Sequence, residues 1–397
     1  MTPLRILLLA LLGLDALVLF LKISDLSISF NEAKIFFGPE SFLTSYITYF
    51  TTLFGQNNYT LRMPMIALHV GSVLLFYAIT APFAKYERDR IWVTVVFMML
   101  PGVTSAALLF DAAGIVLFFL MFYLFLQQRI EKASYPFLGL LIFVDSSFSL
   151  LFLAQILYGY DTRRYRFMAF NVALLIASAG LYGFDFGGVP KSSFVDTLGI
   201  YATIFSPIIF FYLFYVLYRR FLTQKRDLLF YIASTAFLVS LLLSFRQRIG
   251  VETFAPYMMA ALPLAMQSFF HAYRVRLKVH RKLYIRLFIF AFVLLILNEV
   301  IVFFHKEIYR FLPDPDQLFA HRLHVASELA TQLHEHHIEC IDAQSDAMQL
   351  RLQYYGITTC KTYRLVSKKR EESDLNVTIL YKKIPIYKAY VTNIHME

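Results

Sequence analysis

Runs of apolar residues occupy most of the chain before residue 305, and a membrane helix needs about 20 such residues or somewhat fewer. The first run, 6–21, follows Arg5 but lacks the small-residue cleavage site of a signal peptide, so we expect an uncleaved helix. The runs predict membrane helices over residues 6–21, 63–83, 91–109, 112–126, 167–182, 199–218, 228–245, 253–271 and 287–304. This pattern is typical of an α-helical polytopic membrane protein.

The apolar stretch 135–158 differs from the others because basic residues flank both of its ends. Arg129 and Lys132 precede it, and Arg163 follows it. The positive-inside rule then places both ends in the cytoplasm, so we expect a hairpin of two short helices with its tip at residues 145–147. With this hairpin the chain crosses the membrane about eleven times.

Beyond residue 304 the pattern changes to that of a small α/β domain. Amphipathic periodicity predicts helices over 317–333 and 346–355, the second ending at Gly356. Short alternating runs predict strands over 338–341, 376–381 and 386–391. We therefore expect a transmembrane domain over 1–312 and an extracytoplasmic domain over 313–397.

The composition excludes a water-soluble monomer. Of 397 residues, 58% are hydrophobic and only 16% are charged, whereas about a quarter are charged in an ordinary soluble domain. So much apolar surface needs a bilayer to cover it. The net charge of +10 does not indicate nucleic-acid binding, because residues 313–397 hold ten basic and eleven acidic residues and the positive excess belongs to the hydrophobic part.

The distribution of Lys and Arg among the loops predicts the orientation of the chain. Eighteen of them lie in the alternate loops 84–90, 127–134, 159–166, 219–227 and 272–286. The opposite loops hold six: Lys22, Lys34, Arg62, Lys191, Arg246 and Arg248. By the positive-inside rule, we expect an inner (plasma) membrane protein with its N-terminus in the cytoplasm and its C-terminal domain in the periplasm.

Two carboxylates on the predicted outer side are candidates for chemistry. Glu32 lies in the first outer loop, and Asp111 lies in the short turn before the helix at 112–126. A carboxylate there can deprotonate a nucleophile or hold a divalent cation. Both residues can equally cap the helices that follow them, a common role of Asp and Glu at helix starts, and the sequence leaves both interpretations open.

The outer cations Arg62, Lys191, Arg246 and Arg248 form a complementary set. Guanidinium groups bind phosphate through paired, charge-assisted hydrogen bonds, and a lipid phosphate would lie at this depth. Ordinary snorkelling of long basic side chains is the alternative. Cys340 and Cys360 lie in the predicted periplasmic domain, where a disulfide can form, and the sequence alone leaves their pairing open.

The order of these features resembles a known family. Asn31-Glu32 in the first outer loop is followed by Arg62-Met63-Pro64 at the start of a long helix, and Asp111 opens a strongly apolar helix. After the cytoplasmic hairpin come Arg246-Gln247-Arg248, a helix that begins Pro256-Tyr257, and finally Tyr354-Tyr355-Gly356. This order is similar to that of GT-C membrane glycosyltransferases that use polyprenyl-phosphate sugars, in the protein O-mannosyltransferase and aminoarabinose transferase branch.

The resemblance implies an inverting transfer of a sugar from a polyprenyl-phosphate donor to an envelope acceptor at the outer face. It makes Glu32 and Asp111 the catalytic residues, with Mg²⁺ or Mn²⁺ between them as a possible cofactor. Arg246 and Arg248 would neutralise the departing phosphate. The implied substrate-binding set is Asn31, Arg62, Lys191, Arg246, Gln247, Arg248 and Tyr257.

One departure from the family pattern concerns Asn31, because the family's acidic pair usually begins with Asp. An Asn cannot ionise, so either Glu32 takes over as base or the activity is altered or lost. Asn31 thus keeps open a non-catalytic member of the fold, and a transporter or flippase for a lipid or small solute is the other alternative function. A transporter would use intramembrane acids such as Asp15 or Asp145.

Overall fold

The computed structural model describes residues 3–183, 193–311, 314–315, 318, 320–366 and 375–393. The chain divides into two compact units. The helical unit comprises Met1–Ala16, Met65–Ala107 and Ala112–Glu299, and the mixed unit comprises Leu17–Pro64, Leu108–Asp111 and Val300–Glu397. The mixed unit thus combines the first outer loop with the C-terminal region, whereas the sequence pattern places a domain boundary at residue 312.

The helical unit confirms the prediction of a polytopic membrane protein. In the described part of the chain, five helices are long and apolar enough to cross a bilayer, or seven if two bent pairs count as single spans. The five are Pro3–Asp25 (α1 with η1), Asn58–Phe83 (α4 with η2), Ala112–Arg129 (α7), Tyr165–Tyr182 (α10) and Lys278–Phe303 (α16). The apolar helix α13, Leu228–Ser244, is shorter.

Fewer long helices occur than the eleven expected crossings because proline divides several apolar runs. The run 91–109 forms α5 (Glu87–Met98) and α6 (Pro101–Leu108), which meet at 57°. The run 199–218 forms α11 (Phe194–Phe205) and α12 (Pro207–Leu222), which meet at 107°. Proline lacks an N–H and disfavours helical conformation in the residue before it. The run 253–271 is likewise divided into η3 (Val251–Thr253), α14 (Ala255–Met258), η4 (Met259–Ala261) and α15 (Leu262–Val275).

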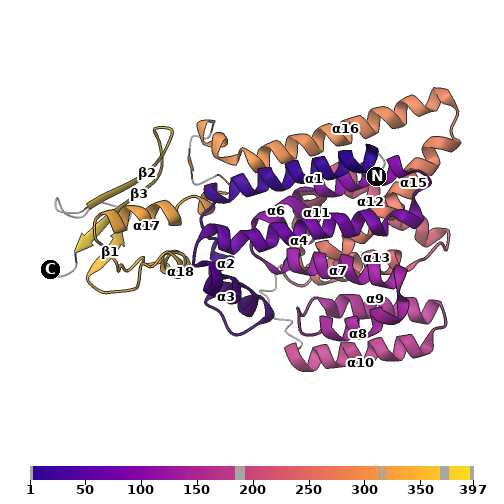
Figure 1. Cartoon of the computed structure of the whole chain (residues 1–397), viewed down its shortest axis with the longest axis horizontal. Helices are drawn as coiled ribbons and strands as arrows, with labels where there is room; N and C mark the ends of the chain where they lie inside the picture. The colour runs from indigo at the N-terminus through magenta and orange to yellow at the C-terminus, as the bar shows by residue number, and fades with distance from the viewer. Residues whose placement is uncertain are drawn as a thin grey trace. The chain divides into compact units, whose positions relative to one another are not determined.

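The stretch 135–158 forms two short helices, as predicted from its basic flanks. They are α8 (Glu131–Leu141) and α9 (Phe148–Asp161). The Asp145 side chain accepts a hydrogen bond from the Ser147 backbone N–H at 2.9 Å, so it acts as a turn residue. In Figure 1, α9 lies beside α10, and these two helices pack on each other along their length.

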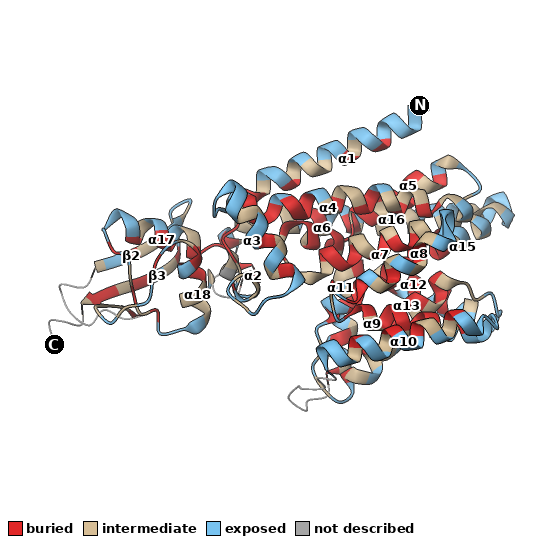
Figure 2. Ribbon diagram, turned by 60° about the horizontal axis from the view of Figure 1, so that its bottom comes forward, coloured by how far each residue is buried: buried red, intermediate tan, exposed pale blue. Residues whose placement is uncertain are grey.

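Apolar side chains also cover the outside of the helical unit. Buried residues concentrate inside the helix bundle, while α10 shows mainly exposed and half-buried residues (Figure 2). Two exposed apolar examples are Leu14 in α1, 57% exposed, and Ile176 in α10, 67% exposed. These positions would destabilise the protein in water, so they indicate the surface in contact with lipid acyl chains.

Acids inside the helical unit have specific partners. Asp15 of α1 contacts His69 of α4, with 2.7 Å between Oδ2 and Nε2. Glu299 of α16 accepts a hydrogen bond from the Thr104 hydroxyl of α6 at 2.7 Å. Because an unpaired charge costs several kcal/mol in a membrane interior, these contacts account for two acids that the apolar helices could not otherwise carry.

The mixed unit contains short helices and one antiparallel sheet. Its strands are β1 (Tyr363–Val366), β2 (Leu375–Tyr381) and β3 (Ile384–Asn393), in the order β1-β3-β2. The helices are α2 (Phe30–Phe36), α3 (Phe42–Phe54), η5 (His305–Arg310), η7 (His321–Leu323), α17 (Ala326–Glu335) and α18 (Asp346–Tyr354).

The predicted elements of the C-terminal region are found with three differences. Helix 346–355 and the strands at 376–381 and 386–391 are present as α18, β2 and β3. The expected helix 317–333 begins later, as α17, and part of the predicted range lies outside the described residues. The expected strand 338–341 forms isolated bridges only, because Cys340 and Asp342 each pair at a single position. Strand β1 has no counterpart in the sequence prediction.

Cys340 and Cys360 form a disulfide, with 5.4 Å between their Cα atoms. The bridge joins the segment after α17 to the segment before β1. The neighbouring core contains Leu329, Leu333, Ile341 and Ile379, all fully buried. The sequence had left this pairing open, and the structure decides it.

Two buried histidines lie where α16 leads into the mixed unit. The rings of His305 and His324 stack with their centroids 4.8 Å apart, and His324 Nδ1 lies 2.9 Å from the Tyr309 hydroxyl. Burial lowers the pKa of His305, and burial together with the charge of Lys306 lowers the pKa of His324 to about 2. Both imidazoles are therefore neutral in the folded protein at neutral pH.

We expect acid to destabilise the protein through these histidines. An unfolded histidine takes up a proton near its ordinary pKa of about 6.5, whereas His324 does not when folded. The stabilisation is therefore complete above about pH 6.5, and between pH 7 and 5 the chain loses about 2 kcal/mol from His324. Thermal unfolding of the full chain in detergent at both pH values checks this. The double variant His305→Asn/His324→Asn should lose much less on acidification, and an equal loss would contradict the assignment.

Candidate functional site

The first outer segment begins its helix α2 with a capping box. Ser29 Oγ accepts a hydrogen bond from the Glu32 backbone N–H at 3.1 Å, and Glu32 Oε2 accepts one from the Ser29 N–H at 2.7 Å. This reciprocal pair satisfies two donors that a helix start leaves unpaired. Glu32 therefore caps α2, as one of the two interpretations of the sequence expected, and its side chain also contacts residues outside this helix.

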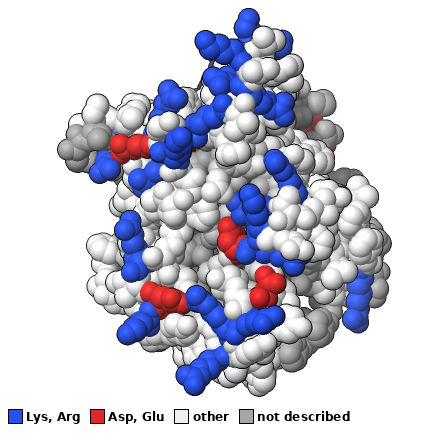
Figure 3. All heavy atoms as spheres, turned by 90° about the vertical axis from the view of Figure 1, so that its right-hand side faces the viewer, with Lys and Arg blue, Asp and Glu red and all other residues white. Residues whose placement is uncertain are grey.

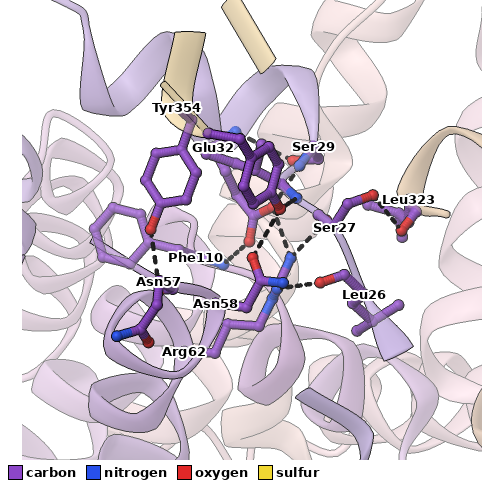
Figure 4. A network of polar contacts seen from close by, with 12 residues as sticks. Leu26, Ser27, Ser29, Glu32, Asn57, Asn58, Arg62, Phe110, Leu323 and Tyr354 are labelled. Atoms are coloured by element: carbon purple, nitrogen blue, oxygen red, sulfur yellow. Dashed lines mark hydrogen bonds and ion pairs between the residues drawn. The ribbon is translucent and has the colours of Figure 1, made fainter. Parts of the chain in front are cut away.

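Glu32 also forms a buried ion pair with Arg62 of α4. Arg62 Nη2 lies 3.1 Å from Glu32 Oε2, and both side chains are almost completely inaccessible, 0% and 1% exposed. The guanidinium also donates to the backbone carbonyls of Leu26 and Ser27, each at 2.8 Å (Figure 4). Removing two charges from water costs several kcal/mol unless both are hydrogen-bonded, and here these added bonds supply that compensation.

A third segment joins the same carboxylate. The Phe110 backbone N–H donates to Glu32 Oε1 at 2.9 Å (Figure 4), and the Phe110 ring stacks on Tyr46 of α3 with centroids 6.4 Å apart. Asp111 is the next residue and directly precedes Ala112, where α7 begins. Asp111 is half-buried, and it follows directly after Phe110, whose backbone N–H binds the carboxylate of the Glu32–Arg62 pair. The structure therefore brings together the segments of both predicted catalytic acids.

Two tyrosines at the end of α18 hold the start of α4. The Tyr354 hydroxyl donates to the Asn57 carbonyl at 3.0 Å, and the Tyr355 hydroxyl donates to Asn58 Oδ1 at 2.7 Å. The Tyr355 oxygen also accepts from the Ile28 N–H at 2.8 Å. Burial raises the pKa of both tyrosines, so each hydroxyl keeps its proton and remains a donor.

A further backbone contact joins the first outer segment to the C-terminal region. The Ser27 N–H and hydroxyl both donate to the Leu323 carbonyl, each at 2.7 Å. Together with the tyrosines, this contact ties residues 26–32 and 57–62 to the C-terminal part of the mixed unit. The candidate site is therefore a connected polar network, which we call the Glu32–Arg62 network: Leu26, Ser27, Ile28, Ser29, Glu32, Asn57, Asn58, Arg62, Phe110, Leu323, Tyr354 and Tyr355.

The other predicted binding residues have different surroundings. Asn31 is exposed on α2, and Lys191 lies outside the described residues. Arg246 and Arg248 are exposed after α13 in the helical unit, and the Gln247 carbonyl accepts from the Ser193 hydroxyl at 3.1 Å.

Tyr257 is fully buried in the helical unit, with its hydroxyl 3.2 Å from Ser147 Oγ. The predicted substrate-binding set is thus divided between the two units. In the mixed unit Arg62 contacts the predicted catalytic acid Glu32. Its guanidinium faces carbonyls and a carboxylate of the protein, so phosphate binding by Arg62 stays a prediction.

The contacts of Glu32 do not fit a divalent cation. Its two oxygens already accept three N–H donors, from Ser29, Arg62 and Phe110. A cation would have to displace at least one donor and would lie beside the positive charge of Arg62. In the part of the chain that the structure describes, no three His, Cys, Asp or Glu side chains gather as metal ligands. Binding of Mg²⁺ or Mn²⁺ stays a prediction.

The sequence prediction missed Ser29, Phe110, Tyr354 and Tyr355 as members of the network. Ser29 could have been found, because Ser-x-x-Glu before a helix is the capping-box signature. The two tyrosines were noted as a motif without a role. Phe110 contributes only its backbone N–H, and no side-chain pattern signals such a contact.

The comparisons with known proteins concern the fold. No protein-family profile and no curated protein sequence matches the chain. The structure is similar to ArnT from Cupriavidus metallidurans in the apo state, with a TM-score of 0.61 and 12% identity over 99% of this chain and 98% of that chain. ArnT from the same organism bound to undecaprenyl phosphate gives a TM-score of 0.58 and 12% identity over 89% of this chain and 85% of that chain. The GT-C fold predicted from the motif order is therefore confirmed.

Proposed function

We propose that this protein is a membrane glycosyltransferase that takes its sugar from a polyprenyl-phosphate donor at the outer face of the inner membrane. The observation that carries the proposal is the GT-C fold, shared over nearly the whole chain with a transferase that has been crystallised with undecaprenyl phosphate. The charge bias of the loops supports an N-terminus in the cytoplasm and a C-terminal region in the periplasm.

Asp111 is the proposed general base. An acceptor oxygen or nitrogen attacks the anomeric carbon, the bond from that carbon to the phosphate oxygen breaks, and the acceptor proton passes to the Asp111 carboxylate. The bond electrons leave with the polyprenyl phosphate, and attack opposite the leaving group inverts the anomeric centre. A correctly placed general base contributes about 10² to 10⁴ in rate.

Glu32 is better suited to positioning than to proton transfer in this conformation. Its carboxylate is buried and accepts three N–H donors, so it would have to lose one of them before it could accept a substrate proton. Through the Phe110 N–H it fixes the backbone next to Asp111. This division of roles answers the question raised by Asn31: the exposed position 31 needs no charge if Asp111 is the base and Glu32 positions it.

Arg246 and Arg248 remain the proposed partners of the departing phosphate. Their side chains are exposed, and the described residues offer neither of them a carboxylate within ion-pair distance. Charge stabilisation of a leaving group is commonly among the larger catalytic terms. Lys191 belongs to the same proposal on charge alone.

The second candidate function is transport of a lipid or small solute. It is favoured by the Asp15–His69 pair, because ionisable residues within membrane helices often mark a substrate or proton pathway. The fold similarity along the whole chain favours the transferase. Under the transport hypothesis, movement of substrate depends on Asp15 and is indifferent to Asp111.

A reconstituted assay tests the proposed function. The purified chain in lipid nanodiscs receives a panel of undecaprenyl-phosphate sugars together with envelope lipid and glycan extracts. We expect release of undecaprenyl phosphate and a matching mass increase of one acceptor, both measured by mass spectrometry. Envelope extracts from cells with and without the chain should differ by the same mass. If no donor on the panel is consumed and the envelopes are identical, the transferase proposal is wrong.

A further inference from the structure

A polar hollow opens in the helical unit between the end of η2 (Ala81–Phe83), the start of α5 and the end of α15. It has a volume of about 460 Å³, and its polar lining residues are Lys85, Asp89, Gln267, His271 and Arg274. Asp89 is buried and pairs with Arg274 through Oδ2. Its other oxygen, Oδ1, is also buried and has no hydrogen-bond partner among the described residues. A donor bound in the hollow, either a water or a ligand hydroxyl, would supply the hydrogen bond that Asp89 Oδ1 lacks.

An apolar groove adjoins this hollow. It has a volume of about 400 Å³ and is lined by α5, α12, α15 and α16, with Arg276 as its only charged lining residue among those described. Met266 and Phe270 line both the groove and the hollow, so the two spaces are neighbours with shared walls. A polar compartment next to an apolar one matches the two ends of an amphiphile.

The length of the groove indicates which amphiphile fits. Along α16 its lining runs from Leu283 to Leu295, which corresponds to about 18 Å of helix. The hydrocarbon core of a bilayer is about 30 Å thick, so the groove is about as long as one leaflet is thick. This length accommodates the acyl chain of an ordinary glycerophospholipid, whereas a polyprenyl chain is much longer.

The charge around both spaces favours an anionic headgroup. Figure 3 shows Lys and Arg side chains crowding the end of the helical unit that carries α15 and the start of α16. Lys85 and Arg276 are exposed and contact the aromatic rings of Tyr86 and Tyr284 at 5.6 and 4.5 Å. Within the described chain neither has a carboxylate within 4.0 Å. Arg274 is compensated by Asp89, so the two uncompensated charges are positive.

We propose that the hollow and the groove together bind an acidic glycerophospholipid with a hydroxylated headgroup, of which phosphatidylglycerol is the probe. One acyl chain occupies the groove, the phosphate lies near Lys85 and Arg276, and a headgroup hydroxyl donates to Asp89 Oδ1. The loop charges place this end of the unit at the cytoplasmic leaflet, where basic pockets between membrane helices bind acidic lipids. The site is separate from the proposed transfer chemistry and does not depend on it.

Lipid binding to the purified full chain tests the headgroup contact. Native mass spectrometry measures the affinity for phosphatidylglycerol, phosphatidylcholine and undecaprenyl phosphate. We expect wild type to prefer phosphatidylglycerol and the variant Lys85→Gln/Arg276→Gln to bind it roughly 30-fold more weakly, from about 1 kcal/mol for each basic residue. The matched control is Arg129→Gln/Lys132→Gln. It removes two exposed cations of another predicted cytoplasmic loop that do not line the hollow, and it should bind phosphatidylglycerol like wild type.

A second pair of variants tests the groove itself. Ala291→Phe fills it, and affinity should fall about tenfold for every two methylene groups kept out. Val293→Phe introduces the same side chain at an exposed position of α16 outside the groove lining and should have no effect. Equal binding of phosphatidylglycerol by all variants overturns the proposal. So does displacement of phosphatidylglycerol by undecaprenyl phosphate with the same dependence on Ala291. Neither result touches the transferase proposal, because no sugar transfer is measured.

Discussion

The variant Arg62→Met should lose about 3–5 kcal/mol of stability, the usual cost of leaving one member of a buried ion pair without its partner. Glu32 would lose its cationic partner in a site with almost no solvent exposure, and the Leu26 and Ser27 carbonyls would lose their donors. Thermal unfolding of the full chain in detergent measures the loss, and limited proteolysis should show new cleavage within residues 23–57. The control Lys34→Met removes an exposed cation from α2 and should leave both measurements within error.

The double variant Glu32→Gln/Arg62→Met distinguishes the ion pair from a packing effect. If the unpaired charge of Glu32 causes the damage, then removing that charge should return part of the lost stability. A double variant that is as unstable as the sum of the two single variants would contradict a direct coupling between the two side chains. Glu32→Gln alone should also destabilise the chain, because an amide group supplies only one oxygen in place of two.

The variant Asp111→Asn should lower sugar transfer by about 10² to 10⁴ without unfolding the protein. Asn has nearly the same shape as Asp and is also a good residue before a helix start, so α7 should begin at Ala112 as before. Initial rates of undecaprenyl phosphate release at saturating donor measure the effect. Glu40→Gln removes an exposed carboxylate from the same unit and provides the matched control, which should transfer sugar at the wild-type rate.

Comparing the two single variants, Glu32→Gln and Asp111→Asn, distinguishes a positioning role from a role in proton transfer. If Glu32 has a positioning role, the Glu32→Gln variant should lose both activity and thermal stability. Its loss of activity should then be smaller at low temperature, where the folded protein is more stable. A base role for Asp111 predicts loss of activity at unchanged stability. Full activity of Asp111→Asn would remove the base assignment, and full stability with lost activity in Glu32→Gln would make Glu32 the base instead.

Features determined by local pattern were readable from the sequence. The polar break at Asp145 and the helix end at Gly356 depend on neighbours within a few residues, and both appear as predicted. The apolar character of the helical unit was readable in the same way, although three of the apolar runs are divided. The division at Ser206-Pro207 was also readable, because proline removes a hydrogen bond wherever it stands. The sequence interpretation ignored it and expected one helix over 199–218.

The Glu32–Arg62 network was decided only by the tertiary structure. The sequence places Glu32, Arg62 and Phe110 in separate segments. Nothing in their local patterns indicates that the Glu32 carboxylate accepts hydrogen bonds from the Arg62 guanidinium and the Phe110 backbone N–H. The structure also gives Arg62 an internal partner where the sequence suggested a lipid phosphate, and gives Asp15 a partner in His69. Hydrophobic periodicity reports which face of a helix is buried. The choice of hydrogen-bond partner between distant segments depends on where each backbone ends up in space, and the cost of burying an unpaired charge enforces that choice.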